Sequence, residues 1–93
     1  MRKIRHTGRF KRDYKREKAG QRGKTLDGEL NEITRLLAAD MALPRHYFDH
    51  PLSGEWRDYR DCHVRPDLIL IYRKPDDKNL DLVRLGSHSE LGF

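Results

Sequence analysis

The sequence contains very little cysteine and no long hydrophobic run. Its one cysteine, Cys62, excludes an internal disulfide and a zinc site built from several thiolates. The opening residues, MRKIRHTGRF, hold no apolar stretch of signal-peptide length, and no segment approaches the length of a membrane span. We therefore expect a cytoplasmic protein with no membrane partner, in which Cys62 is a small packed side chain.

Apolar residues are scarce as well. Of the 93 residues, 35% are hydrophobic and 38% are charged. A chain of this length forms one domain around one modest core. It has no repeats, low-complexity tracts or linkers, and its aromatic residues and apolar runs argue against general disorder. We expect a single domain over residues 1–93.

Acidic residues are nearly absent from the N-terminal part. Residues 1–24 hold eleven Lys or Arg against two acids, whereas residues 25–93 hold nine against thirteen. A positive field at one end of the chain favours a polyanion such as RNA or DNA, or an acidic protein partner. The alternative is a solvated basic helix that only aids solubility.

The N-terminal part predicts one strand and two helices. Residues 2–7 are typical of a short edge strand, and residues 8–19 of a helix capped by Thr7, with Phe10 and Tyr14 on its inner face. Thr25 is the expected cap of a second helix. The apolar residues of that helix recur at the 3.6-residue period, at Leu26, Leu30, Ile33 and Leu37.

The C-terminal part predicts three strands. Residues 40–55, which contain two prolines, are read as a long loop. Strands follow at 56–64, 68–73 and 79–86, and the apolar run LILIY indicates that the middle one is a central strand. We therefore expect an α+β fold with the order β-α-α-β-β-β, in which two helices pack on a small, mainly antiparallel sheet.

This topology brings three ionisable residues to one rim of the sheet. His63 ends the first of the three strands, Asp67 opens the second, and His88 follows the third. The ends of antiparallel neighbours share an edge, so these side chains should converge, with His50 in the preceding loop. Taken one at a time, each histidine could be an ordinary surface residue, and Asp67 could be only a turn residue.

Such a group suits the cleavage of RNA. Attack by the adjacent 2′-OH needs a base, an acid for the departing 5′ oxygen, and positive charge at phosphorus. Histidine can fill either proton role near neutral pH, Arg84 could hold the phosphate, and no metal is required. His46 and His50 have the spacing of a zinc pair, but two nearby prolines leave room for barely one helical turn and no thiol pair completes a site.

The segments DHPLSGEWRDYRDCHVRPDLILIY and LVRLGSHSELGF carry a combined motif. Its parts are D-H-P-L-x-G-x-W, R-D-x-H-V-x-P-D, L-I-Y and R-x-G-x-H-x-x-L. In these motifs, in length and in element order, the chain resembles the YafQ branch of the RelE-type bacterial toxins, within the RelE/ParE superfamily. The resemblance implies a RelE-like fold and a ribosome-dependent mRNA endonuclease without a cofactor, neutralised by a cognate antitoxin. Its functional residues correspond here to His50, His63, Asp67 and His88.

The resemblance also implies roles for other residues. His88 would be the general acid, Asp67 or His50 the base, and a protonated His63 would stabilise the phosphorane. Arg60 and Arg84 would bind phosphate or support the fold. The family's aromatic residue after the last histidine corresponds to Phe93, one position later than usual because Gly92 is inserted.

Two partners are expected for the basic N-terminal part. Ribosomal RNA would be held through its phosphates, and an acidic antitoxin segment would compete for the same surface. The alternatives are a ribonuclease that cuts free RNA, a non-catalytic nucleic-acid- or protein-binding module, and a degenerate toxin. The cations expected to bind RNA are Lys11, Arg12, Lys15, Arg16 and Lys18.

Overall fold

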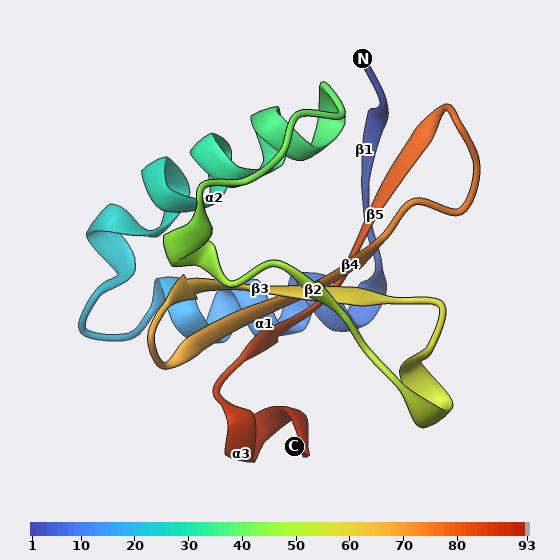
Figure 1. The fold of residues 1–93 in the computed structure, drawn as a ribbon. Coiled ribbons are helices and arrows are strands. Elements are labelled where there is room, and N and C mark those ends of the chain that lie inside the picture. Colours follow the sequence, from blue (N-terminus) through green and yellow to red (C-terminus); the bar gives the residue numbers. More distant parts are fainter. Residues whose placement is uncertain (93) are drawn as a thin grey trace.

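One five-stranded sheet organises the molecule, in the strand order β1-β5-β4-β3-β2. The structure is a computed structural model that describes residues 1–92. Helices α1 and α2 follow β1, and a short helix α3 follows β5 (Figure 1). The bounds are β1 Lys3–His6, α1 Gly8–Lys18, α2 Gly23–Ala38, β2 His50–Pro51, β3 Arg60–Arg65, β4 Leu68–Arg73, β5 Asn79–Gly86 and α3 His88–Leu91, with 3-10 helices η1 Arg45–Tyr47 and η2 Gly54–Trp56. This confirms the α+β class and the predicted order of the main elements.

The sheet is mainly antiparallel, as predicted, with one parallel pair. Strand β1 runs parallel to β5, while the pairs β2–β3, β3–β4 and β4–β5 are antiparallel. Strand β4 lies in the middle of the sheet, and five of its six residues are buried. Its apolar sequence therefore reflects burial on both faces.

Helices α1 and α2 cover one face of the sheet and enclose the main core. The four periodic residues of α2 are all buried, and Phe10 of α1 is buried against them. Each such side chain contributes roughly 1.5–3 kcal/mol through the apolar area it removes from water. Cys62 is also fully buried there, as expected, and its burial raises the pKa of the thiol.

The two helices start in different ways. The Thr7 hydroxyl accepts a hydrogen bond from the Phe10 N–H at 3.1 Å and caps α1, as predicted. The prediction that Thr25 caps α2 is wrong, because α2 begins at Gly23 and no side chain caps it. A Cβ on Gly23 would lie 1.9 Å from the Lys18 carbonyl oxygen, so close packing on α1 fixes this start.

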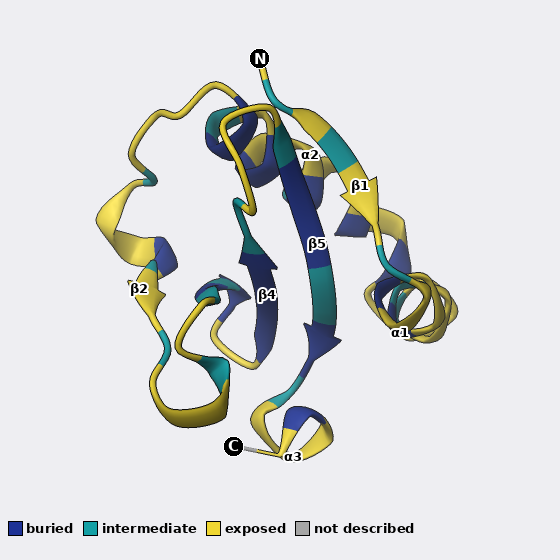
Figure 2. Cartoon of the chain, turned by 90° about the vertical axis from the view of Figure 1, so that its right-hand side faces the viewer, coloured by how far each residue is buried: buried dark blue, intermediate teal, exposed yellow. Residues whose placement is uncertain are grey.

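The opposite face of the sheet carries a smaller apolar cluster beneath α3. Ile69 and Ile71 of β4 contact Leu91 of α3, and partly buried residues of the connection before β3 join them. Figure 2 shows α3 at the end of the sheet where β5 finishes, away from β1 and the N-terminus. This second face holds the candidate site.

The structure contains short elements that the sequence analysis did not predict, and one strand starts later than predicted. The expected loop 40–55 contains the two-residue strand β2, and the strand expected from 56 begins only at Arg60, because Trp56 lies in a 3-10 helix. The tail after β5 forms α3, held by a capping box in which Ser87 and Glu90 bond each other's backbone N–H. Within residues 1–92, no helix has the length and apolar character needed to cross a membrane.

Candidate active site

The strand register places the site residues in two neighbouring rows on one face. In the first row, His50 of β2 lies opposite Asp61 of β3, which lies opposite Ile71 of β4 and then Arg84 of β5. Directly opposed residues point to the same face of a sheet. His50, Asp61 and Arg84 therefore share the face that α3 partly covers.

The second row lies two residues further along the strands. His63 faces Ile69, which faces Gly86, and His88 follows two residues later at the start of α3. The imidazole rings of His63 and His88 have centroids 5.6 Å apart at an interplanar angle of 63°. The predicted convergence of these two histidines is therefore present.

Asp61 is the buried centre of this group. It is 5% exposed, and its Oδ1 lies 3.1 Å from the Nδ1 of His50. Burial raises the pKa of Asp61, and the nearby His50, His63 and His88 oppose that rise. A buried carboxylate thus interacts electrostatically with three imidazoles, and we refer to these four residues as the histidine–carboxylate cluster.

His50 has a defined tautomer. Its Nδ1 lies 2.8 Å from the carbonyl oxygen of Phe48. Since a carbonyl oxygen can only accept, Nδ1 must carry the proton and donate it. Oδ1 of Asp61 makes no hydrogen bond, because this N–H points toward Phe48. The Nε2 of a neutral His50 is therefore the nitrogen with a free lone pair, and about half of the side chain is exposed.

Asp67 lies in the turn between β3 and β4 and is exposed. It lines a hollow of about 220 Å³ together with Glu17 and Arg22 from the α1–α2 region, and its charge acts on Arg65. None of its described contacts reaches the three histidines. The carboxylate next to them is Asp61, which the sequence analysis did not select. Its signal was the two-residue spacing to His63, which puts both side chains on one face of a strand.

The two candidate phosphate-binding arginines are engaged within the protein. Arg84 donates from Nε to Asp13 of α1 at 2.7 Å and is half-buried. Arg60 donates from Nε to Asp49 at 3.3 Å and contacts the Tyr72 hydroxyl at the same distance. These contacts support the structural role that the sequence analysis left open for both residues.

The five cations of α1 that the sequence analysis selected fall into two groups. Arg16 pairs with Asp13, Glu17 and Glu90, and Lys18 pairs with Asp27. The remaining three are exposed and form no ion pair within residues 1–92. The outer face of α1, defined by Lys11, Arg12 and Lys15, is therefore available to an anionic partner.

The aromatic residue expected near the site and the question of a metal site remain. Phe93 falls outside the described residues. In the part of the chain that the structure describes, no group of three or more His, Cys, Asp or Glu side chains is arranged to hold a metal ion.

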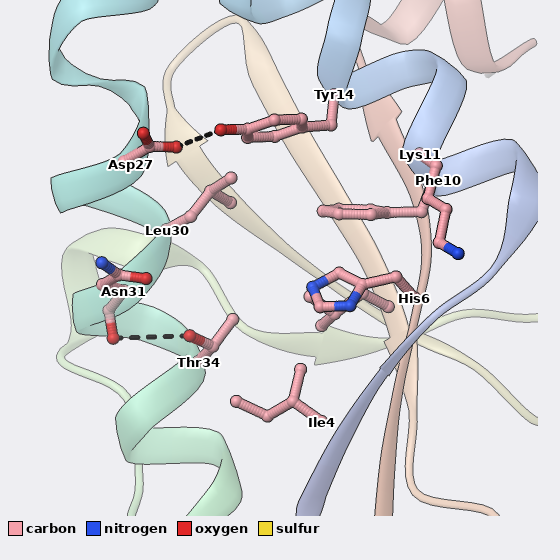
Figure 3. A pocket seen from close by; sticks show the side chains of 10 residues that line it. Ile4, His6, Phe10, Lys11, Tyr14, Asp27, Leu30, Asn31 and Thr34 are labelled. Carbon is pink, nitrogen blue, oxygen red and sulfur yellow. Dashed lines mark hydrogen bonds between the residues drawn. The ribbon is translucent and has the colours of Figure 1, made fainter.

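A hollow of about 470 Å³ lies away from the histidines, between β1, α1 and α2. In Figure 3 the rings of Phe10 and Tyr14 lie beside one another over it, and the Tyr14 hydroxyl points to Asp27. Its floor includes Ile4 and Leu30. No residue of the histidine–carboxylate cluster lines this hollow, so it is separate from the candidate active site.

Comparison with known proteins bears on this arrangement. The family described as bacterial toxin of type II toxin–antitoxin system, YafQ, matches residues 2–92. The mRNA interferase toxin YafQ of Escherichia coli strain K12 is 42% identical over 91 residues, covering 98% of this chain and 96% of that protein.

Solved structures agree with the sequence relatives. The crystal structure of the E. coli DinJ–YafQ complex contains a chain with a TM-score of 0.83 and 38% identity, covering 98% of both chains. The crystal structure of a metal-bound toxin from Helicobacter pylori has a TM-score of 0.82 and 42% identity, covering 98% of this chain and 99% of that one. These matches extend over both rows of the site.

Proposed function

The chain belongs to the YafQ family of bacterial toxins of type II toxin–antitoxin systems, and from this premise we propose that it is an endoribonuclease that cleaves mRNA on the ribosome. Translation would stop as a result, and a cognate antitoxin would neutralise the protein. The observation that carries the proposal is the histidine–carboxylate cluster, in which His50 lies 3.1 Å from the buried Asp61, and His63 and His88, with ring centroids 5.6 Å apart, act on its charge. A protein that acts on translated mRNA works in the cytoplasm.

The reaction is attack of a 2′-OH on the neighbouring phosphate. A base removes the hydroxyl proton, O2′ bonds to phosphorus, and the bond from phosphorus to the 5′ oxygen breaks. The departing oxygen takes a proton from an acid. The products are a 2′,3′-cyclic phosphate and a free 5′-OH, so atoms and charge balance without a redox partner. Each positioned proton-transfer group accelerates such a reaction by about 10²–10⁴-fold.

His50 is the proposed base. Its Nδ1–H is fixed on the Phe48 carbonyl, which leaves Nε2 to accept the 2′-OH proton. Asp61 lies behind the ring at 3.1 Å and balances the positive charge that His50 gains in the reaction. Asp61 is thus a positioning residue, since it acts through His50 and not on the RNA.

His88 and His63 face the same carboxylate from the other row. His88 is exposed at the start of α3, which suits the acid that protonates the 5′ oxygen. His63 is half-buried between Phe48 and His88, and a protonated ring there would stabilise charge on the phosphorane. Asp67 remains a proposed site residue, but we favour His50 over Asp67 as the base because no described contact of Asp67 reaches the three histidines.

Metal independence is part of the proposal. The three imidazoles fill the base, acid and charge-stabilising roles that a metal-bound hydroxide and a Lewis acid would otherwise take. The H. pylori relative has a metal-bound crystal structure, which is a property of that protein.

Ribosomal RNA is the proposed partner of the outer face of α1. Three exposed cations without an intramolecular ion pair would neutralise phosphates, which gives affinity without sequence reading. E. coli YafQ forms a toxin–antitoxin complex with DinJ. By analogy, a cognate antitoxin of this protein would compete with ribosomal RNA for the outer face of α1. The engaged Arg16 and Lys18 would contribute less, because binding would first break their ion pairs.

One cleavage assay tests the proposal. A labelled mRNA is incubated with and without programmed ribosomes, using the wild type, His88→Ala and the control His6→Ala, which changes an exposed histidine outside the cluster. We expect cutting only on ribosomes, 2′,3′-cyclic phosphate ends, and loss of cutting in His88→Ala alone. Cutting of free RNA would indicate a general ribonuclease. No cutting by the folded wild type would indicate a binding module or an inactive toxin.

A further inference from the structure

Phe48 is an exposed aromatic residue beside the histidine–carboxylate cluster. Its side chain is 65% exposed, whereas most large apolar residues of the protein are buried. A phenyl ring in water contributes little hydrophobic stabilisation to folding. Its presence at this position therefore calls for a reason outside the core.

The backbone of Phe48 gives a second indication. Its φ of 50° and ψ of 44° lie in the left-handed region, which is disfavoured for a bulky side chain and natural for glycine or asparagine. Disfavoured backbone conformations persist where the surrounding structure enforces them, and they concentrate at functional sites. The stability of the fold therefore explains neither the exposed ring of Phe48 nor its left-handed backbone.

The segment around Phe48 is anchored on both sides. Tyr47 is buried in the main core, and Asp49 accepts a hydrogen bond from the Tyr72 hydroxyl at 2.5 Å. The Phe48 N–H donates to the Arg45 carbonyl at 3.0 Å. The ring is therefore presented to solvent by a fixed support, which lowers the entropy cost of binding a ligand on it.

The ring also contacts the cluster directly. Its centroid lies 5.6 Å from that of His63, at an interplanar angle of 61°. Its carbonyl is the group that orients His50. A ligand group on Phe48 is thus held close to two of the three histidines.

A hollow of about 380 Å³ adjoins the ring. Its size is in the range of small-molecule pockets. The guanidinium of Arg65 is committed to Glu29 at 2.6 Å and to the Arg22 carbonyl, so it offers no free hydrogen-bond fork. Ring faces and apolar groups dominate the lining, which consists of His46, Phe48, His63, Val64, Arg65 and Pro66.

We infer that this hollow is a subsite for one nucleobase of the RNA, stacked on Phe48 next to the phosphate that the 2′-OH attacks. The inference rests on the proposed function and adds a positioning contact to it. Stacking on an aromatic face suits every base, so the subsite places the nucleotide and reads its sequence weakly. His46 lines the same hollow and supplies a second flat ring.

The binding test uses an uncleavable mRNA with a 2′-O-methyl group at the cut nucleotide, on programmed ribosomes. The variants are Phe48→Ala, Phe48→Tyr, and Phe48→Gly, which removes the ring and suits the left-handed backbone. Met41→Ala, another exposed apolar residue, is the control. We expect the two ring-free variants to lose affinity by about 5- to 150-fold, the range that corresponds to stacking of one base, and the other two to match the wild type. Equal affinity of all variants would overturn the subsite.

A second test removes the base instead of the ring. Cleavable mRNAs carry an abasic nucleotide on one or the other side of the cut. One of them should be cut more slowly by the wild type, with no further loss in Phe48→Gly, since the same contact is then missing twice. Independent, additive losses would contradict stacking. A wild type that cuts no RNA would refute the proposed function itself, whereas a wild type that cuts normally and is indifferent to Phe48 would refute only the subsite.

Discussion

Asp61 lies buried under His50, with 3.1 Å between the carboxylate Oδ1 and the imidazole Nδ1. The same Nδ1 donates its proton to the Phe48 carbonyl. The carboxylate therefore lacks a hydrogen bond on Oδ1 and depends on nearby positive charge. This relationship links the stability of the protein to its chemistry, because removing the charge should favour folding and weaken catalysis.

Asp61→Asn should show both effects. Because burial raises the pKa of Asp61, its charged form destabilises the fold as pH rises from the usual aspartate range through the raised pKa. The variant should therefore have a higher melting temperature than the wild type at pH 7 and a smaller advantage at pH 4. Cleavage should fall, by less than the roughly 10²–10⁴-fold expected for a proton-transfer group. Thermal unfolding at both pH values, with Asp77→Asn as an exposed control, checks the sign.

The pH profile of cleavage should separate the base from the acid. A base must be deprotonated to act, so His50→Gln should remove the fall in rate on the acidic side. An acid must be protonated, so His88→Gln should remove the fall on the alkaline side. Each variant should lose about 10²–10⁴-fold in rate. Single-turnover rates from pH 5 to 9 give the profiles, and the opposite pattern would exchange the two roles.

Removing metal from the toxin should leave its activity unchanged. The protein would be treated with a chelator, desalted and added to ribosomes in their usual magnesium buffer. We expect the same cleavage rate as for untreated protein, because side chains supply all three roles. Loss of activity that zinc or copper restores would overturn metal independence.

Charge reversal on the outer face of α1 should weaken ribosome binding. Lys11→Glu combined with Lys15→Glu removes two cations that make no ion pair within residues 1–92. The slope of log affinity against log salt should fall by about 1 for each lost phosphate contact. Arg35→Glu combined with Lys78→Glu changes two exposed cations outside α1 and is the matched control. Equal losses in both pairs would mean that net charge, not this face, sets the affinity.

Asp13 should be essential for stability rather than for cleavage. It is 4% exposed and accepts from Arg84 at 2.7 Å and from the Leu85 N–H at 3.0 Å. Burial opposes its ionisation, but Arg84 and the N–H outweigh this and lower the pKa of Asp13. The stabilisation is therefore present above the usual aspartate range and is lost as pH falls through the lowered pKa. Asp13→Ala should cost about 3–5 kcal/mol in urea unfolding at pH 7, with a smaller difference near pH 3.

The sequence predicted the elements whose signals are long and periodic. Strands β4 and β5 have the expected bounds, since an apolar run and a Pro-Asp-Asp turn delimit them. Strand β2 was missed because two residues, one of them Pro51, carry no strand pattern. The start of α2 was missed because contact between Gly23 and α1 decides it, and no local cap does.

The site residues, too, were predicted only where the sequence pattern was sufficient. His63 and His88 meet because strand topology alone brings their positions together. Asp61 was not selected because a charged residue within a strand looks like a surface residue until its burial is known. The Nδ1 contact of His50 is local in sequence, but it depends on the left-handed backbone of Phe48, which the sequence pattern does not predict for a bulky residue.

The parallel pairing of β1 with β5 also has a consequence for synthesis. Lys3 pairs with Asn79 and His6 with Leu82, so the first strand must wait for β5 to be made before it joins the sheet. His88 comes later still, at the start of α3. A nascent chain that has not yet reached β5 and α3 therefore lacks both the closed sheet and this histidine. The sheet and the histidine pair are therefore completed late in synthesis, and the candidate site can form only in a chain that has been made through α3.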